Sequence, residues 1–490
     1  MTPSPKQYDL GQFENQSDVG RLHYAGTVEY DPAQQIYTIA SAGANIWDDH
    51  DDFHFVWRRF HGNFIVTMRA GFSGAGANPH RKLGWMARAS LDTSSAQVCT
   101  AVHGDGLLSL QFRRTQGGQI EEVKAPLSGA DVIQLERKGN TYSMSVAHFG
   151  DPFTTVQANE IDLGEDVFLG LFVCSHEDTV VEKATFRDVR IVAPVKEGFD
   201  RSRDPFGSRL EILDVASGHR QIVYSRDDVF EAPNWTRDGQ ALIFNREGRL
   251  YRFDLETKTP ALIDTGEIVR NNNDHVLSFD GSLLAISSHA TTGDYPSLVY
   301  TVAVQGGQPK QVTATGPSYL HGWSPDGKFL VYTGQRHGVF DIYRIPVEGG
   351  EETQLTNLPG LDDGPEYTPD GRYIYFNSVR SGRMQIWRML ANASKPDGSQ
   401  PEQLTNDEYN NWFPHISPDG KQMVFVTYLA GEVEPSDHPA AKRVYLRLMP
   451  LDGGTPKVLA YLYGGQGTMN VPSWSPDGKK IAFVSNTVPY

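Results

Sequence analysis

Six copies of one short pattern occupy the C-terminal half of the chain, and they limit its fold more than any other feature. Each copy has an apolar or aromatic residue, a short linker, Asp-Gly, and then an apolar run of strand length. The copies are NWTRDGQALIF, VLSFDGSLLAI, GWSPDGKFLVY, EYTPDGRYIYF, HISPDGKQMVF and SWSPDGKKIAF, and their apolar or aromatic residues are Trp235, Leu277, Trp323, Tyr367, Ile416 and Trp474. These residues are 42, 46, 44, 49 and 58 positions apart. A period in this range, with four strand-like runs per copy, predicts a six-bladed β-propeller.

The rest of the chain also predicts strands, so the expected fold class is all-β. Residues 1–194 alternate strand-like runs with Gly, Asp and Asn turns and show no helical period, which predicts a two-sheet sandwich. Residues 195–207 are polar with Pro and Gly, as in a linker, and 208–490 form the propeller. Ser208–Ser225 is a strand–turn–strand without an inner strand, and the last copy has inner strands only. We therefore expect the N-terminal hairpin of the propeller to complete its C-terminal blade, a strand exchange that closes the ring.

Composition excludes several classes of partner. The formal net charge is −16, whereas a nucleic-acid partner requires a basic face. No apolar run approaches the ~20 residues of a membrane span. The N-terminus lacks a charged segment followed by an apolar one, which predicts a cytoplasmic protein, or a periplasmic or secreted one if residue 1 is a processed start.

The chain has two cysteines, Cys99 and Cys174, which are too few for a disulfide framework. Both are predicted to be buried thiols.

The repeat breaks in a way that predicts a site in the central channel. Pro stands two places before the apolar or aromatic residue in four copies, but His275 and His321 stand there in the second and third. One place later, the fourth and fifth copies carry Glu366 and His415. We expect these four side chains to enter the channel from consecutive blades, where they could bind a metal ion. The alternative is that they satisfy buried backbone groups.

The segments just upstream of the inner strands are rich in Asn, Asp, Tyr and Trp. Amides and carboxylates hydrogen-bond hydroxyl groups, and aromatic faces stack on sugar rings, so a saccharide is the expected ligand. The fifth copy also contains an insertion, Thr427–Val444, which accounts for the 58-residue spacing and brings His438 within reach of the channel mouth. The candidate substrate-binding residues are Arg270, Asn272, Tyr319, Asn410, Trp412, Asn470 and His438.

The motifs resemble known families. S-P-D-G followed by an apolar strand and then DIYR (Asp341–Arg344) or QIWR (Gln385–Arg388) is similar to the TolB-type propeller repeat. That resemblance covers Ser208–Tyr490 and implies a fold, because such propellers have many functions. In the first 194 residues, DFHFVW, GWMAR and FRDVRI resemble the concanavalin-like jelly roll.

A second resemblance concerns function. NNWFPHISPDG is similar to the metal-bearing inner strand of oligogalacturonate lyases, although Phe413 stands where their second histidine would fall. The resemblance implies a divalent metal held by channel histidines, with His321 and His415 as ligands, His275 as a base or third ligand, and no organic cofactor. Mn, Zn and Ca remain open as the metal.

Two classes of function follow. The first is a carbohydrate-active enzyme, either a metal-assisted lyase or a glycoside hydrolase, with His275, Glu366 and Asp363 as candidate catalytic residues. Hydrolysis requires two carboxylates, for which Asp274, Asp362, Asp363 and Glu366 are available; the excess of histidine favours the metal-assisted reaction. The second is a non-catalytic propeller scaffold that binds a saccharide or a protein. A third class, the accessory propeller of a peptidase, is not expected, because neither a hydrolase domain nor a G-x-S-x-G motif follows the propeller.

Overall fold

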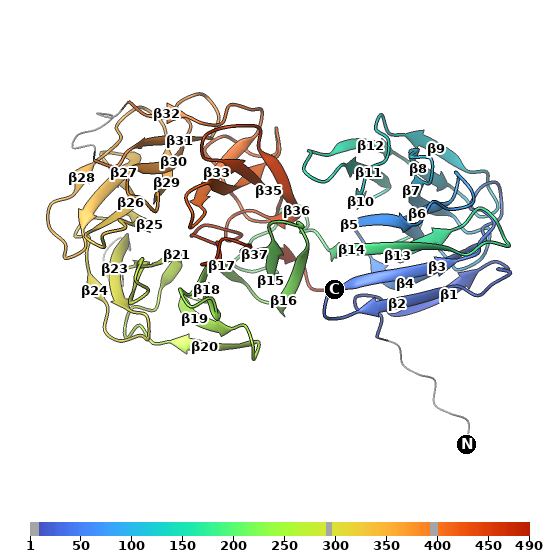
Figure 1. The fold of residues 1–490 in the computed structure, drawn as a ribbon, viewed down its shortest axis with the longest axis horizontal. Coiled ribbons are helices and arrows are strands. Elements are labelled where there is room, and N and C mark those ends of the chain that lie inside the picture. The colour runs from blue at the N-terminus through green and yellow to red at the C-terminus, as the bar shows by residue number, and fades with distance from the viewer. Residues whose placement is uncertain (1–8, 291–295, 393–399) are drawn as a thin grey trace, which may run out of the picture. The chain divides into compact units, whose positions relative to one another are not determined.

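The computed structural model describes residues 9–290, 296–392 and 400–490. It divides into two compact units, Met1–Lys196 with Tyr490, and Glu197–Pro489. All regular elements among the described residues are strands (Figure 1), which confirms the all-β class. Within the described ranges, no helix is long and apolar enough to cross a membrane.

The first unit contains two antiparallel seven-stranded sheets. One has the order β1 (Asn15–Val19), β4 (Phe53–His61), β13 (Asp166–Cys174), β6 (Lys82–Arg88), β7 (Gln97–His103), β8 (Leu108–Arg113), β9 (Glu121–Lys124). The other has the order β12 (Thr154–Ala158), β11 (Thr141–Ala147), β10 (Val132–Lys138), β5 (Phe64–Ser73), β14 (Glu182–Val192), β3 (Ile36–Ser41), β2 (Thr27–Asp31). Alternate residues such as Val66 and Met68 of β5, and Leu83 and Trp85 of β6, belong to one shared hydrophobic core. Cys99 and Cys174 are buried free thiols.

A buried ion cluster pins the loop before β4 to the first sheet. Both carboxylate oxygens of Asp51 accept hydrogen bonds from Arg113, at 2.8 and 2.9 Å, and Asp51 Oδ2 also accepts one from Arg88 at 3.2 Å. All three side chains are fully buried. Because an unpaired charge is costly in this environment, each residue depends on the others.

The second unit is a six-bladed propeller, as the repeat predicted, with its blades around a central axis (Figure 1). Five blades are antiparallel four-stranded sheets: β17 (Phe230–Trp235), β18 (Ala241–Arg246), β19 (Arg249–Asp254), β20 (Thr259–Ile263); β21 (Asn271–Leu277), β22 (Leu283–His289), β23 (Ser297–Ala303), β24 (Lys310–Gln311); β25 (Ser318–Trp323), β26 (Phe329–Arg336), β27 (Val339–Pro346), β28 (Thr353–Gln354); β29 (Asp362–Tyr367), β30 (Tyr373–Ser378), β31 (Gln385–Leu390), β32 (Glu402–Gln403); β33 (Asn410–Ile416), β34 (Gln422–Tyr428), β35 (Lys442–Pro450), β36 (Lys457–Gly464). The sixth has the order β16 (Arg220–Arg226), β15 (Gly207–Asp214), β37 (Lys480–Thr487), and Trp474 forms a bridge to Ile481.

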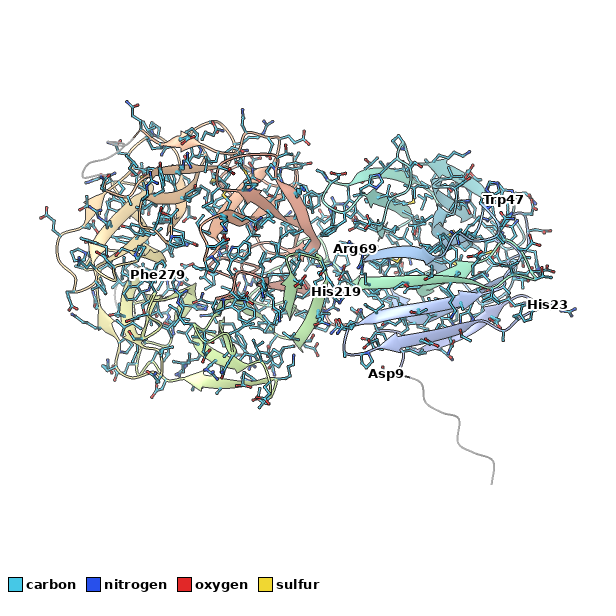
Figure 2. All side chains as sticks on the ribbon, viewed as in Figure 1. Asp9, His23, Trp47, Arg69, His219 and Phe279 are labelled. Atoms are coloured by element: carbon cyan, nitrogen blue, oxygen red, sulfur yellow. The ribbon has the colours of Figure 1, made fainter. Side chains whose placement is uncertain are left out.

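The recurring Ser/Thr-x-Asp-Gly sequence has a local explanation. In every copy the hydroxyl donates a hydrogen bond of 2.6 or 2.7 Å to the Asp carboxylate two residues later, and the Gly has a positive φ of 68–74° that favours glycine. Figure 2 shows Phe279 in the second of these turns, where the guanidinium carbon of Arg237 from the first turn lies 5.3 Å from the centre of its ring. Each inner strand therefore ends in a turn held by its own sequence.

Candidate functional site in the propeller

The inner strands β17, β21, β25, β29 and β33 each contain a β-bulge. In β17, β29 and β33 the bulge holds a residue with positive φ followed by Pro: Ala232-Pro233, Gly364-Pro365 and Phe413-Pro414. Proline suits a bulge because it has no N–H to donate to the ladder. In β21 and β25 this proline is absent, and polar residues stand at the bulge.

The bulge in β21 adds two residues relative to its partner strand, one more than the bulge in β25. Three residues of β21 (272–274) lie between the paired residues Asn271 and His275, opposite one residue of β22. In β25 only His321 lies between the paired residues Leu320 and Gly322, which pair with adjacent residues of β26. As a result His275 resumes ladder pairing, opposite Ile286, and Asp274 takes the place in the second blade that His321 has in the third.

These bulges line a central cavity of about 400 Å³. Its walls come from the second to fifth blades, the fifth-blade insertion and the segment after β36. The lining residues are Asn272, Asn273, Asp274, His289, Tyr319, His321, Thr333, Phe340, Leu361, Asp363, Phe413, Ser436, His438, Gln466 and Asn470.

Asp363 is the best-connected carboxylate of the central cavity. Its Oδ1 atom accepts hydrogen bonds from Thr333 Oγ1 (2.7 Å) and the Gly364 N–H (2.8 Å), and His321 Nε2 lies at 3.2 Å. Burial opposes ionisation of Asp363, but the hydrogen bond and positive charge of His321, together with His438 and Thr333, outweigh it and lower the pKa to about 2. Burial disfavours the charged form of His321 too, but the hydrogen bond to Asp363 and the charges of Asp363 and Asp274 raise its pKa. Asp363 is therefore ionised, and its charge favours the protonated form of His321.

Asp274 has the opposite electrostatic environment. Burial is the main cause that raises its pKa to about 7, and the negative charges of Asp363 and Glu231 act in the same direction; His321 opposes them. The central cavity thus contains one carboxylate that stays ionised and a second that holds its proton up to neutral pH.

The fifth-blade insertion contributes His438. Its Nδ1 atom lies 2.7 Å from Gln466 Oε1, and its Nε2 atom lies 4.0 Å from Asp363 Oδ2. The ring packs edge-on against Trp412, with centroids 4.3 Å apart, and against Phe413. These contacts hold an imidazole next to the second oxygen of Asp363.

The four residues expected to enter the channel together are separated in the structure. His321 lines the central cavity, whereas His275 is fully buried, with Nε2 3.1 Å from the Ile243 carbonyl and a pKa that burial lowers to about 4. Glu366 and His415 pair with each other, at 2.7 Å from Oε2 to Nδ1. The extra bulge residue of β21 explains the position of His275, because it turns Asp274 to the cavity instead.

The Glu366–His415 pair joins neighbouring blades. Glu366 Oε1 accepts a hydrogen bond from the Ile416 N–H at 2.9 Å, and His415 Nε2 lies 3.1 Å from the Met469 carbonyl. Both imidazole nitrogens of His415 therefore already have partners within the protein. Asn234 acts likewise at the same repeat position, because its Oδ1 atom accepts a hydrogen bond from the Leu277 N–H at 3.1 Å.

The predicted substrate-binding residues divide in the same way. Asn272, Tyr319, Asn470 and His438 line the central cavity. The other three are Arg270, which precedes β21 and donates a hydrogen bond to the Ala290 carbonyl; Asn410, which lines a second pocket beneath the insertion; and Trp412, which is fully buried behind His438. The central cavity is also lined by residues that the repeat pattern does not indicate, among them Asn273, His289, Thr333, Phe340 and Gln466. Thr333, Phe340 and His289 belong to the second or third strand of their blades, β26, β27 and β22. The repeat pattern does not predict which residues of those strands reach the channel.

The predicted metal ligands His275, His321 and His415 do not form a three-ligand group. Among the described residues, only His80, His103 and Asp105, in the first unit, place three ligand atoms within 4.8 Å of one another.

Comparisons with known proteins agree with the propeller architecture. A family model described as "TolB beta propeller domain" matches residues 320–438. The uncharacterized protein Atu1656 of Agrobacterium fabrum is 47% identical over 278 residues, which are 56% of this chain and 92% of that protein. A solved structure of a putative TolB from Agrobacterium tumefaciens is 46% identical, with a TM-score of 0.54, and the match covers 58% of this chain and 99% of that one. An oligogalacturonate lyase in complex with manganese is 15% identical, with a TM-score of 0.38 over 78% of this chain and 97% of that one, and this likeness carries no functional argument.

Proposed function

For this chain, which belongs to the family of TolB-like six-bladed β-propellers, we propose that the central cavity binds a short saccharide and cleaves a glycosidic bond by acid catalysis. The observation that carries the proposal is the pair Asp274 and Asp363, which line one cavity with pKa values near 7 and near 2. Glycoside hydrolases commonly use two carboxylates whose environments separate their pKa values in this way.

The lining of the central cavity supports a saccharide ligand. Asn272, Asn273 and Asn470 offer amide donors and acceptors, and Tyr319 and Phe340 offer aromatic surface. Amides suit the mixed donor and acceptor character of sugar hydroxyls, and apolar ring faces pack on aromatic side chains. A volume of about 400 Å³ suits a short saccharide, because it lies at the lower end of the range for small-molecule sites.

Each carboxylate has a distinct role in the proposed reaction. Asp274 donates its proton to the glycosidic oxygen as the bond between that oxygen and the anomeric carbon breaks. Asp363 remains ionised and stabilises the positive charge that develops on the sugar ring. Its Oδ1 atom is already occupied by Thr333, Gly364 and His321, so Oδ2, near His438, is the oxygen that faces the substrate. Water then adds to the anomeric carbon, and its proton returns to the Asp274 carboxylate.

Hydrolysis fits the donor set of the central cavity better than metal-assisted elimination does. His321 is hydrogen-bonded to Asp363, and His438 faces Asp363 and Gln466. The two histidines therefore support a carboxylate. Glu366 and His275, the other candidate catalytic residues, are engaged between and behind the inner strands.

A second candidate function is saccharide binding without catalysis. It is favoured by the dense hydrogen bonding of Asp363, which resembles a rigid binding group.

For the first unit we propose a concanavalin-like sandwich of residues 1–194 that binds saccharides in its own right, with 195–207 as the linker. The cellular location, cytoplasmic or periplasmic, stays a prediction.

Activity and binding measurements on four proteins test the proposal: the wild type, Asp274→Asn, Asp363→Asn and the control Asp452→Asn, whose residue lies in an exposed turn outside the cavity. A panel of oligosaccharides is screened by calorimetric binding and by release of reducing ends. We expect Asp274→Asn to bind the active saccharide with nearly unchanged affinity and to cleave it about 10²–10⁴ times more slowly. Aryl glycosides with good leaving groups need no proton, so they should restore much of the rate.

The outcomes separate the two candidate functions. Unchanged cleavage in Asp274→Asn would refute the acid role. If the wild type binds a saccharide without cleaving it, and Asp363→Asn loses that binding, only the non-catalytic binding function remains supported. If no saccharide of the panel binds, both candidate functions fail.

A further inference from the structure

We propose that His80, His103 and Asp105 form a binding site for a zinc-class divalent transition-metal ion in the first unit. The site is distinct from the central cavity, since all three residues belong to the first unit and the cavity lies in the propeller. Their ligand atoms lie within 4.8 Å of one another, and His80 Nδ1 lies 3.7 Å from Asp105 Oδ2.

The backbone holds the three residues in place. His80 precedes β6, and His103 ends β7, directly before the turn that carries Asp105. The Gly104 N–H donates to the Arg81 carbonyl at 3.0 Å, and the Asp105 N–H donates to the Pro79 carbonyl at 2.8 Å. The two segments that supply the ligands are therefore tied together before any ion arrives.

His103 provides an independent sign of an absent partner. His103 is buried, with 6% of its surface exposed, and its Nδ1 atom has no hydrogen-bond partner. A buried polar atom without a partner is costly and calls for an explanation. A metal ion at Nδ1 supplies one.

Gln111 orients the His103 ring. The Gln111 amide nitrogen lies 3.3 Å from His103 Nε2, while the Gln111 Oε1 atom has no partner. Turning the amide over, which exchanges its oxygen and nitrogen, lets Oε1 accept a hydrogen bond from His103 Nε2–H. The Nδ1 lone pair is then left for the metal, which is the usual way in which a metal-binding histidine is fixed by its other nitrogen.

The two basic side chains next to His80, His103 and Asp105 already have partners. Lys82 lies nearby, but its ammonium group is held by Asn45 Oδ1 at 3.0 Å and by His176 Nδ1 at 3.3 Å. Arg81 is paired with Glu182 at 2.6 Å. His176 Nδ1 is thus engaged, so we assign the fourth position to water on the exposed side, next to His80 and Asp105.

The donor set selects the class of ion. Two imidazoles and one carboxylate suit zinc and its neighbours, whereas magnesium and calcium prefer sites made only of oxygen. Three protein ligands with a water in the fourth position leave a coordination site open for an exogenous ligand.

Metal titration of the full chain, untagged and stripped with a chelator, tests the proposal. Zn²⁺ is titrated in competition with a chromophoric chelator, and Co²⁺ is added separately to record its visible spectrum. We expect one equivalent of Zn²⁺ per chain, a Co²⁺ spectrum of low coordination number, and no competition from millimolar Mg²⁺ or Ca²⁺. The variants His80→Ala and Asp105→Asn change exposed residues and should each weaken zinc binding at least about tenfold.

Two controls fix the location of the ion. His61→Ala alters a second exposed His–Asp pair, in which His61 Nδ1 lies 3.1 Å from Asp166, and it should leave zinc binding unchanged. His321→Ala removes a histidine of the central cavity and should also leave it unchanged. The proposal is overturned if the wild type takes up no zinc, if His80→Ala and Asp105→Asn bind as the wild type does, or if His321→Ala alone abolishes binding.

Discussion

Replacing Asp274 by Asn should stabilise the propeller at pH 8 and leave its stability unchanged at pH 4. Burial raises the pKa of this carboxyl from 3.8 to about 7 in the folded chain. Between these two pH values the folded protein keeps a proton that the unfolded chain releases, so raising the pH favours unfolding. Asn has nearly the same shape and never ionises, so it removes this penalty.

The size of the effect follows from the change in pKa. A difference of about three units, at 1.36 kcal/mol per unit, corresponds to about 4 kcal/mol by pH 8. For a unit as large as Glu197–Pro489, each kcal/mol moves the melting temperature by about 2 °C. The variant should therefore melt roughly 8 °C higher than the wild type at pH 8, with the difference shrinking to nothing near pH 4.

Differential scanning calorimetry of the full chain at intervals from pH 4 to pH 8.5 measures this difference. The control Asp452→Asn also removes one aspartate charge, but from an exposed turn, and its difference from the wild type should not vary with pH. A constant difference for Asp274→Asn, or a less stable variant at pH 8, would refute the electrostatic argument. The variant should also lose cleavage, a trade of activity for stability that is common where a site holds a buried charge.

Two further substitutions test the parts of the fold that support the site. Glu366→Met leaves the Ile416 N–H and His415 Nδ1 without a partner; it should lower the free energy of unfolding of the propeller by about 3 kcal/mol and leave saccharide affinity unchanged in titration calorimetry. Lost affinity with unchanged stability would instead return Glu366 to the site. Asp51→Asn leaves two buried arginines without their counter-charge and should destabilise the first unit by about 3–5 kcal/mol. Scanning calorimetry should show its transition move alone, and an equal shift of the propeller transition would contradict this.

The number of blades could be predicted from the sequence because the turn chemistry is local. Ser278 and Asp280 hydrogen-bond within one turn, and Gly281 supplies the positive φ that follows, so the same letters recur in each blade. The Trp at this repeat position has a second role in the third copy. The Nε1–H of Trp323 donates a hydrogen bond to the Val276 carbonyl of the preceding blade at 2.9 Å. Both requirements depend on residues at fixed positions in the repeat, which is why counting the copies counted the blades.

The site could be predicted only in part, because the length of a β-bulge decides which side chains point into the cavity. Where Pro is absent at position 321, a polar residue stands at the bulge, and His321 lines the central cavity. The same rule selected His275, but the bulge of β21 holds one more residue, and Asp274 faces the cavity instead. Strand pairing decides the length of a bulge, and pairing depends on the neighbouring strand β22, so the alignment of repeats alone could not reveal it.

Polar residues on the inner strands of this propeller therefore have two distinct origins. Directly before the repeat Trp or its equivalent, Asn234 and Glu366 accept the backbone N–H of the next blade, so a polar side chain there serves the ring itself. At the bulge, the inner strands β17, β29 and β33 have Pro, which needs no partner, so the ring can close without a polar side chain there. Asp274 and His321 are two polar residues at the bulges of adjacent blades, and each is buried at a cost that the fold alone does not explain. That cost is the physical reason to assign ligand chemistry to this pair, together with Asp363, and to assign structural roles to Glu366 and His415.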